Sequence, residues 1–262
     1  MSDAYKAVIF DWAGTLIDFG SRAPMGVFVE AFARFGVDVS VEEARGPMGA
    51  AKRDHIKAML GAVDIAGRWE SAHGAPPGED EIDAVYKVFL PMNEEIAADY
   101  AEPIPGAVET LAWLRARGLK IGSTTGYTRS IMERVLPVAA SHGISVDCLV
   151  CAGDVAEGRP APLGIYKNLV ELGVYPPEAV VKVDDTEVGI GEGLQAGCLT
   201  VGITLSGNLV GRTEAELNAL PLEEVAELRE RAARRLMAAG AEHVIDSVAD
   251  LPRLMERLGT GR

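Results

Sequence analysis

The chain has 262 residues, of which 48% are hydrophobic and 24% charged, a balance that excludes a disordered or fibrous protein. Its formal net charge is -14 and the sequence contains no basic cluster, so we expect neither a nucleic-acid partner nor an anionic membrane partner. The N-terminus enters an apolar strand without a basic start or a long apolar run, and the apolar runs are too short to cross a bilayer, which leads us to expect a cytoplasmic protein.

Short apolar strand candidates alternate with amphipathic helices along the chain. The candidate strands are AVIFDW (7–12), LKIGSTT (119–125), DCLVCAG (147–153), AVVKVDD (179–185), CLTVGIT (198–204) and HVIDS (243–247). This alternation predicts an α/β fold, a doubly wound and Rossmann-like parallel sheet with helices on both faces. Such sheets bind ligands outside the carboxyl ends of their strands, so residues that follow the strands are the first candidates for a site.

The first two strands are unusually far apart. Roughly a hundred residues separate them, many more than one crossover helix needs. Most of these residues read as helices, and the main ones are VFVEAFARFG (27–36), AAKRDHIKAMLGAV (50–63) and EIDAVYKVFLPMNEEIAADY (81–100). We therefore expect an inserted α-helical domain at residues 19–99, and a core domain formed by residues 1–18 and 100–262. The proline and glycine of EPIPGA mark the return to the core.

Two other features have a structural interpretation. Cys148 and Cys151 form a C-x-x-C in a strand-like run, where residues three apart point to opposite faces, and no second Cys/His pair completes a zinc site. We interpret them as small buried side chains. Residues 206–240 are acidic and rich in Ala, Leu, Glu and Arg, which predicts a further helical excursion.

The most specific string in the chain is VIFDWAGTLID, which places Asp11 at the end of the first strand. An aspartate in this position can attack a phosphoryl group and form an aspartyl-phosphate that water later hydrolyses. A lone aspartate at a strand end is more often a helix cap or a turn former. A catalytic interpretation therefore needs further groups in the same place.

Three later segments supply such groups. STTG offers hydroxyl and N–H donors for phosphate oxygens, although Thr125 could equally cap a helix. GRPAP places Arg159 in a loop, where a fixed cation can neutralise phosphoryl oxygens or simply be solvated. VDDT pairs Asp184 with Asp185 at a strand end, and these are hard oxygen ligands of the kind that Mg²⁺ prefers, unless they are only surface aspartates of a turn.

Together these four segments resemble the haloacid dehalogenase (HAD) superfamily, and the resemblance covers the whole chain. It implies that Asp11 is the nucleophile, that Thr125 and Arg159 bind the phosphoryl group, and that the acidic pair holds Mg²⁺. The helical insertion after the first strand matches the cap domain common in that superfamily. The expected fold is therefore a HAD-like core with an inserted α-helical cap.

The sequence departs from that superfamily's phosphatases at Ala13. They usually carry an aspartate two residues after the nucleophile, where it protonates the leaving oxygen. Without this acid, either the enzyme is impaired or its leaving group needs no proton. Halide meets the second condition, but dehalogenases work without Mg²⁺ and have little use for the acidic pair. A carbon leaving group also meets it, provided that another group accepts the electrons of the broken P–C bond.

The helix predicted at residues 50–63 offers that group. On a helical wheel an apolar stripe is formed by Met48, Ile56, Met59, Leu60 and Val63. Lys52 falls inside this stripe and His55 lies on its edge. A lysine amine against apolar surroundings loses proton affinity and can form a Schiff base with an aldehyde, whose iminium accepts electrons. The alternative is that Lys52 only extends its apolar stem over this surface and keeps its charged end in water.

The combination of Ala13 with GPMGAAKRDHI resembles the phosphonatases, the branch of the superfamily that cleaves a P–C bond through a lysine Schiff base. FDWAGT and STTGYT also look like that branch's versions of the core motifs. The resemblance implies roles in catalysis for Asp11, Lys52, His55, Thr125 and Arg159, in substrate binding for Met48, Gly49 and Tyr127, and in metal binding for Asp11, Ala13 (through its carbonyl) and Asp185. Asp184 stands where many superfamily members have glycine and Gly189 where many have aspartate, so metal ligation by Asp184 stays open.

The resemblance implies hydrolysis of phosphonoacetaldehyde to acetaldehyde and phosphate, in phosphonate degradation. The resemblance also implies Mg²⁺ as the cofactor, a small-molecule phosphonate as the partner and a homodimer through the cap, although the helix VFVEAFARF fits burial inside the cap equally well. Two alternatives stay open. One is a HAD-type phosphatase or phosphomutase acting on a small phosphate ester, and the other is a non-catalytic phosphate-binding protein of the same fold.

Overall fold

The computed structural model describes residues 5–260, and all six predicted strands are present. They form one parallel sheet in the order β3-β2-β1-β4-β5-β6. The strands are β1 (Ala7–Phe10), β2 (Lys120–Thr128), β3 (Cys148–Ala152), β4 (Val180–Asp184), β5 (Leu199–Ile203) and β6 (His243–Ile245). The strand order reverses between β1 and β4, so the crevice outside the carboxyl ends of these two strands is the expected ligand site.

Helices cover both faces of the sheet, which confirms the predicted fold class. Val8 and Phe10 point to a cluster that includes α6 (Ala107–Ala116), α7 (Arg129–Ser141) and α12 (Leu251–Thr260). Ala7 and Ile9 point to the opposite cluster, which includes α8 (Leu163–Leu172); α9 (Glu187–Ala196) lies over β4 and β5. This alternation follows from the two-residue period of a strand, and because both faces are covered, β1 is apolar along its whole length.

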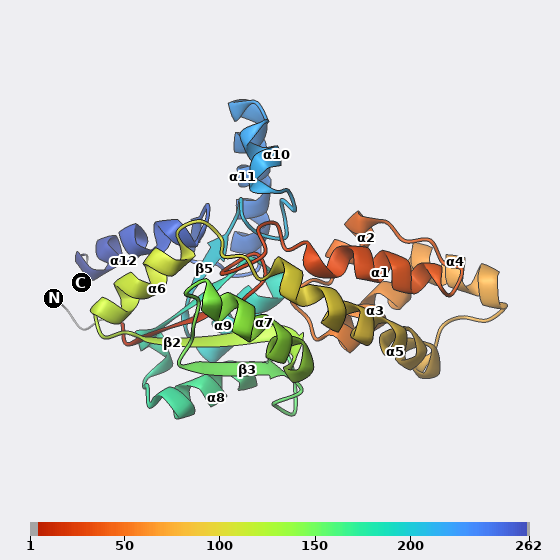
Figure 1. Ribbon diagram of the computed structural model, residues 1–262, viewed down its shortest axis with the longest axis horizontal. Coiled ribbons are helices and arrows are strands. Elements are labelled where there is room, and N and C mark those ends of the chain that lie inside the picture. The colour runs from red at the N-terminus through yellow and green to blue at the C-terminus, as the bar shows by residue number, and fades with distance from the viewer. Residues whose placement is uncertain (1–4, 261–262) are drawn as a thin grey trace.

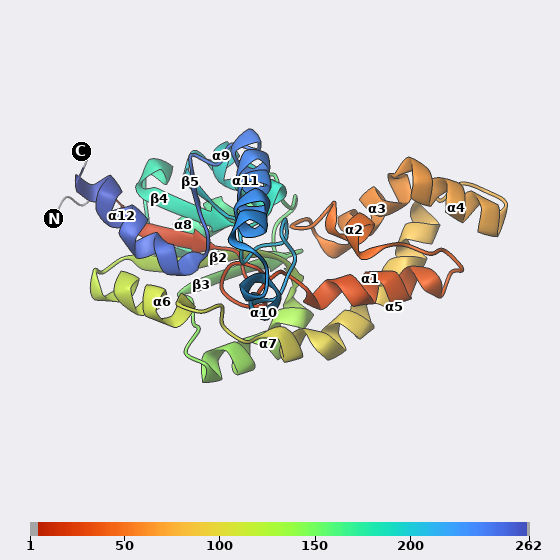
Figure 2. The same ribbon diagram turned by 90° about the horizontal axis from the view of Figure 1, so that it is seen from above.

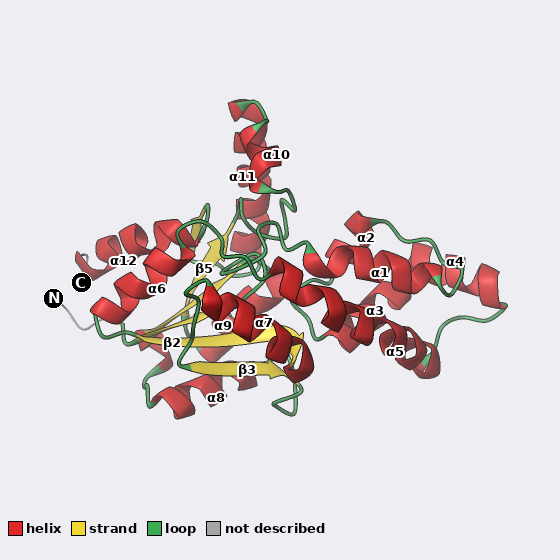
Figure 3. Ribbon diagram, viewed as in Figure 1, coloured by secondary structure: helices red, strands yellow, loops and turns green. Residues whose placement is uncertain are grey.

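Most of the segment between β1 and β2, up to α6, forms a second, all-helical lobe, at the right in Figures 1 and 2. Its elements are α1 (Ala23–Ala33), α2 (Val41–Arg45), α3 (Lys52–Gly61), α4 (Val63–His73), α5 (Glu79–Ile96) and η1 (Ala97–Tyr100). This lobe has its own hydrophobic cluster, centred on Phe28, Ile56, Trp69 and Phe89. Figure 3 shows strands only in the other lobe. The separate cluster supports the division into core and cap, and the limits 19 and 99 remain a prediction.

Two expected element boundaries were wrong. The helix expected at 50–63 is shorter, because the extended backbone of Ala62 (ψ 132°) ends α3 and starts α4. Val63 therefore leaves the apolar stripe and is 86% exposed. The second candidate strand ended at Thr125, yet β2 continues to Thr128, with an irregular register against β3 between Thr124 and Thr128.

The helical excursion predicted at residues 206–240 is present. It consists of α10 (Glu214–Asn218) and α11 (Leu222–Ala238), which project from the core lobe in Figure 1. The remaining elements are the short helices η2 (Pro177–Ala179) and η3 (Val248–Asp250). Between residues 5 and 260, no helix combines the length and the apolar character needed to span a membrane. Cys151 is buried as expected, whereas Cys148 is only partly buried, and neither forms a disulfide.

Candidate active site

Asp11 lies directly after β1, where the chain turns over the end of the sheet. Its backbone N–H donates to the carbonyl of Val183 at 3.0 Å, which continues the ladder between β1 and β4. The side chain is buried, 6% exposed, and accepts a hydrogen bond from Arg159 at 2.8 Å. The turn after it passes very close to the end of β4, since a Cβ at Gly14 (φ +84°) would lie 2.2 Å from Asp185 Oδ2. Only glycine fits this left-handed position.

Three carboxylates converge at this edge of the sheet. Asp11, Asp184 and Asp185 are all buried, and each offers an oxygen within 4.8 Å of the others. Burial, followed by the charge of Asp184, raises the pKa of Asp11 to about 6. Burial and the neighbouring Asp11 and Asp184 raise the pKa of Asp185 well above its usual value. Burial also acts on Asp184, but Lys182 and Arg159 hold its pKa below the usual value.

This donor set fits a hard divalent cation. Buried carboxylates that repel one another are stabilised when a cation neutralises them, and oxygen ligands suit Mg²⁺ and similar ions. Asp184 Oδ2 is buried and receives no well-formed hydrogen bond from the described residues, although the amine of Lys182 lies 3.0 Å away. Ala13 lines the cavity next to Asp11, and its role as a carbonyl ligand remains a prediction.

If the three carboxylates hold Mg²⁺ as predicted, the ion should raise the melting temperature, because it would bind their folded arrangement and not the unfolded chain. At a concentration of 100 Kd the gain is about 2.7 kcal/mol. Asp185→Asn should remove most of this shift, and Asp64→Asn, a change to an exposed aspartate of the cap, should keep it. Thermal denaturation with and without Mg²⁺ measures it. Equal shifts in wild type and Asp185→Asn would place the ion elsewhere.

Arg159 is held by a buried charged network. Its Nη1 donates to Asp11 Oδ1, and its Nε lies 3.0 Å from Glu192 Oε2. Its Nη2 donates to the carbonyl and hydroxyl oxygens of Thr124. Lys182, fully buried in the middle of β4, donates to Thr124 Oγ1 at 2.8 Å and lies 3.3 Å from Glu192. Burial alone would lower the pKa of Arg159, but the surrounding carboxylates raise it above its usual value. Arg159 is therefore a permanent cation with a fixed orientation.

Sequence reasoning missed Lys182 and Glu192, and it included Thr124 only as part of the STTG segment. A signal was present in VVKV and GEG, where a charged residue interrupts an apolar strand or stands between glycines. The glycines make the space: a Cβ at Gly164 would lie 2.8 Å from Glu192 Oε1, and a Cβ at Gly193 would lie 2.7 Å from Lys182 Cγ. These three residues anchor the guanidinium that was predicted to bind the phosphoryl group.

Lys52 is the first residue of α3 and extends from the cap toward Asp11. The residue is only 3% exposed, so it is buried rather than solvated. Its amine lies 5.1 Å from the ring centre of Tyr127, 5.8 Å from that of Phe28 and 3.8 Å from Met48 Sδ. Among the described residues, no carboxylate lies within ion-pair distance of it. Burial, only partly opposed by the charge of Asp11, lowers the pKa of Lys52 to about 8.

His55 lies one turn further along α3 and behind Lys52. Its ring is fully buried and stacks on Phe28 with centroids 4.1 Å apart, while Nε2 lies 2.8 Å from the carbonyl of Ala44. Burial and the neighbouring Lys52 lower the pKa of His55 to about 3, so the ring is neutral and donates to Ala44 through Nε2–H. His55 does not line the cavity, and its catalytic role remains a prediction.

One small cavity brings together most of the predicted site residues. It is lined by Asp11, Ala13, Ser21, Met48, Gly49, Lys52, Thr125, Gly126, Tyr127 and Thr186. Thr125 Oγ1 accepts a hydrogen bond from the N–H of Tyr127 at 3.1 Å. Ser21 was not predicted, and its buried hydroxyl has no partner among the described residues. The cavity measures only about 20 Å³, so the cap is closed over the core and a substrate needs it to open.

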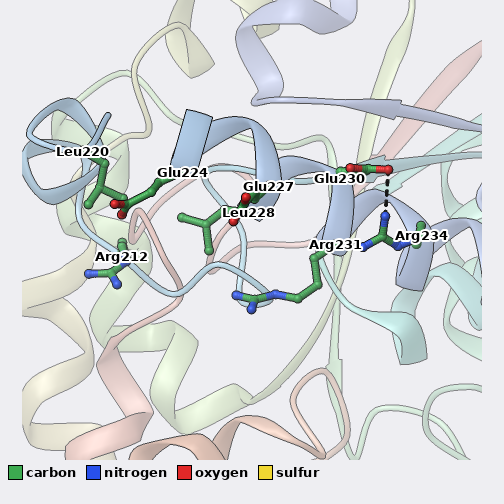
Figure 4. A pocket seen from close by; sticks show the side chains of 8 residues that line it. All are labelled: Arg212, Leu220, Glu224, Glu227, Leu228, Glu230, Arg231 and Arg234. Atoms are coloured by element: carbon green, nitrogen blue, oxygen red, sulfur yellow. Dashed lines mark ion pairs between the residues drawn. The ribbon is translucent and has the colours of Figure 1, made fainter. Parts of the chain in front are cut away.

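A wider pocket of about 580 Å³ lies elsewhere, beside α11 (Figure 4). Its charged lining residues are Arg212, Glu224, Glu227, Glu230, Arg231 and Arg234. These charges are of both signs, and Glu230 pairs with Arg234 at 2.7 Å. The pocket contains none of the residues predicted for catalysis, so the small cavity between cap and core is the candidate active site.

The fold and this site define a haloacid dehalogenase-like hydrolase, and the family model of that description matches residues 5–197. The match runs from β1 through the cap to the end of α9, so it includes every residue predicted for the site.

Similarity to known proteins identifies the family within this class of hydrolases. The chain is 53% identical over 246 residues to the phosphonoacetaldehyde hydrolase of Paraburkholderia xenovorans (strain LB400), covering 94% of this chain and 92% of that protein. It is 46% identical over 254 residues to the one of Salmonella typhi, with 96% and 94% covered. A crystal structure of a phosphonoacetaldehyde hydrolase-like protein from Oleispira antarctica superposes with a TM-score of 0.95 at 42% identity, covering 99% of this chain and 95% of that one. The chain belongs to the phosphonoacetaldehyde hydrolase family.

Proposed function

We propose that this enzyme hydrolyses phosphonoacetaldehyde to acetaldehyde and phosphate through a Schiff base on Lys52 and an aspartyl-phosphate on Asp11. The observation that carries the proposal is that the buried side chains of Lys52 and Asp11 line the same small cavity. Ala13 lines it too, at the position where the phosphatases of the superfamily usually carry an aspartate. The names of the relatives agree with this substrate.

The first step is imine formation. The neutral amine of Lys52 adds to the aldehyde carbon, and the carbinolamine takes up a proton and loses water to give a protonated imine. The lowered pKa of Lys52 supplies enough neutral amine near neutral pH. The aromatic rings of Tyr127 and Phe28, close to the nitrogen, favour the cationic iminium that forms.

The second step is transfer of the phosphoryl group. Asp11 attacks phosphorus, the P–C bond breaks, and its electron pair moves into the iminium to give an enamine, so no leaving oxygen needs a proton and Ala13 is sufficient. Water then hydrolyses the aspartyl-phosphate. The enamine gains a proton at carbon, and a second water releases acetaldehyde and restores Lys52. Since imine formation released one water, the net reaction consumes one.

Charge on the phosphoryl oxygens is offset from two sides. Arg159 presents a fixed guanidinium next to Asp11, and Thr125 presents a hydroxyl group. Asp11, Asp185 and the carbonyl of Ala13 would hold Mg²⁺, which would supply the remaining positive charge. Asp184 lies against Lys182 and Arg159 and orients them.

The direct test is to measure phosphate and acetaldehyde together from phosphonoacetaldehyde, with and without Mg²⁺. We expect equal amounts of both products and dependence on the ion. A phosphate monoester with a poor leaving group serves as the comparison substrate, and it should be turned over far more slowly because Ala13 provides no acid. Comparable turnover of the ester, or phosphate without acetaldehyde, would contradict the proposal and favour a phosphatase.

The pH dependence of kcat/KM should report Lys52. Only the neutral amine adds to the aldehyde, so kcat/KM is expected to rise about tenfold per pH unit below pH 8 and to level off above it. The pKa of Asp11, about 6 without a cation, also shapes the acidic side of the profile, and this pKa should be lower when Mg²⁺ is bound. Rates between pH 5.5 and 9.5 at saturating Mg²⁺ measure the profile. A profile that is flat from pH 6 to 9 would exclude a protonated lysine as the resting state.

We also propose a cytoplasmic enzyme that forms a homodimer through the cap. The apolar face of α1 is not available for a dimer contact, because Val27, Phe28 and Phe32 are buried inside the cap itself. The dimer therefore rests on the family resemblance, and sedimentation of the purified protein tests it.

A further inference from the structure

Arg45, the last residue of α2 in the cap, reaches across to the core. Its Nη1 donates to the carbonyl oxygens of Gly20 (2.9 Å) and Ser21 (3.3 Å) and to the side-chain oxygen of Asn208 (3.0 Å). Its Nη2 donates to the carbonyl of Gly211 at 3.2 Å. These acceptors belong to two segments, the linker into the cap and the loop that follows β5. One guanidinium thus ties the cap to both.

The contact is reciprocal and uses neutral oxygens. The side-chain amide of Asn208, itself 3% exposed, donates to the carbonyl of Arg45 at 3.3 Å. Among the described residues, Arg45 has no carboxylate within ion-pair distance. A planar fork of donors suits this arrangement of several oxygens, and an ammonium group does not reproduce it. We call the side chains of Arg45 and Asn208, with the carbonyl oxygens of Gly20, Ser21 and Gly211, the Arg45 clamp.

The clamp is continuous with the predicted metal site. The backbone N–H of Asn208 donates to Asp185 Oδ2 at 2.7 Å. A Cβ at Gly207 would lie 2.6 Å from Asp185 Cβ, and a Cβ at Gly211 (φ +66°) would lie 2.5 Å from Arg45 Cζ. The loop therefore fits closely against both Asp185 and Arg45, and a shift of one end displaces the other.

The clamp also determines where Lys52 enters the site. Only a short turn separates Arg45 from Lys52, and this turn touches the core without spare room. A Cβ at Gly49 (φ +95°) would lie 2.4 Å from Thr186 Oγ1, and a Cβ at Gly126 would lie 2.6 Å from the carbonyl of Ala50. In this closed structure, the turn that makes these contacts leads directly into Lys52, which lines the cavity.

The geometry points to Arg45 and Asn208 as positioning residues that hold the cap closed and couple the placement of Lys52 to that of Asp185. This inference depends on the proposed function only in the roles that it gives to Lys52 and Asp185. Opening the clamp exposes the amine and loosens the metal ligand at the same time. A cation at Asp185, in turn, favours the closed cap.

The test uses the full chain without substrate, so it does not depend on turnover. The variant is Arg45→Met, with Asn208→Ala as the second variant because it keeps the backbone N–H to Asp185. The control is Arg53→Met, which removes a cap arginine whose ion pairs, to Glu79 and Asp83, stay inside the cap. Acetylation of Lys52 by acetic anhydride, followed by peptide mass spectrometry, reports closure. Calorimetric titration with Mg²⁺ reports Asp185.

We expect Arg45→Met to raise the acetylation rate of Lys52 about tenfold or more and to weaken Mg²⁺ binding severalfold, since hydrogen bonds to a charged group are lost. Asn208→Ala should raise the acetylation rate, and the double variant should add little to Arg45→Met. Arg53→Met should change neither quantity. Folded variants in which Lys52 reacts as slowly as in wild type would overturn the clamp. Faster acetylation with unchanged Mg²⁺ affinity would overturn the coupling to Asp185.

Discussion

Lys52→Met is expected to abolish P–C cleavage while leaving the protein folded. The variant keeps an unbranched side chain of similar length in an apolar place, but no nitrogen remains to form the imine, so the broken bond has no electron acceptor. We expect kcat/KM for phosphonoacetaldehyde to fall by roughly 10⁴-fold or more, the scale of losing a group that forms a covalent intermediate. Release of acetaldehyde measures the loss.

The matched control is Lys57→Met on the same helix. Lys57 is exposed and pairs with Glu79 at 2.6 Å, so its replacement should change the rate little. Borohydride added with substrate should trap an adduct at Lys52 in wild type and in Lys57→Met, and none in Lys52→Met. An active Lys52→Met enzyme, or an adduct at another lysine, would remove the Schiff base from the mechanism.

The stability of the Lys52 variant gives a second readout. Burial lowers the pKa of Lys52 from its ordinary value of 10.5 to about 8 in the folded protein, so the unfolded chain binds more protons between these values. Wild type should therefore become more stable, relative to Lys52→Met, as pH rises from about 8 to about 10.5. Chemical denaturation at pH 7.5 and 10 measures this difference, and an unchanged difference would show that the amine is not buried.

The second large effect is expected for Asp11→Asn. The amide has the shape of the carboxylate but is not a nucleophile, so phosphoryl transfer should fall by about 10⁵-fold. The imine on Lys52 does not need Asp11 as a nucleophile. Borohydride should therefore still trap the substrate on Lys52 in this variant, while no phosphate is released. Mass spectrometry of the trapped enzyme, with the phosphorus still attached, distinguishes the two steps.

The control for Asp11→Asn is structural. The amide also weakens the bond to Arg159 and reduces the repulsion among three buried carboxylates, so melting temperature without Mg²⁺ should not fall much. If no imine could be trapped in Asp11→Asn, imine formation on Lys52 would depend on Asp11, contrary to the proposed order of steps. If it retained phosphate release, Asp11 would not be the nucleophile.

The sequence by itself determined the architecture. The buried strands, the length of the insertion after β1 and the carboxylates at strand ends are local signals, because period and apolar content act over a few neighbouring residues. They located Asp11 and Asp185 next to the correct strands, and the sheet order then brings β1 and β4 side by side. The same local signals failed at Val63, where one extended residue ends a helix, and at the end of β2.

Only the tertiary structure decided what surrounds Lys52. Periodicity did not decide between burial and solvation of its amine, because one wall of its cavity comes from Tyr127 in β2, far along the chain. Similarly, Arg45 in VEEARG has the pattern of an ordinary exposed helix residue, and Lys182 looks like an interruption of an apolar strand. Their partners, Asn208 and Glu192, are supplied by loops and helices that fold against them, and contacts between distant segments leave no periodic trace in the sequence.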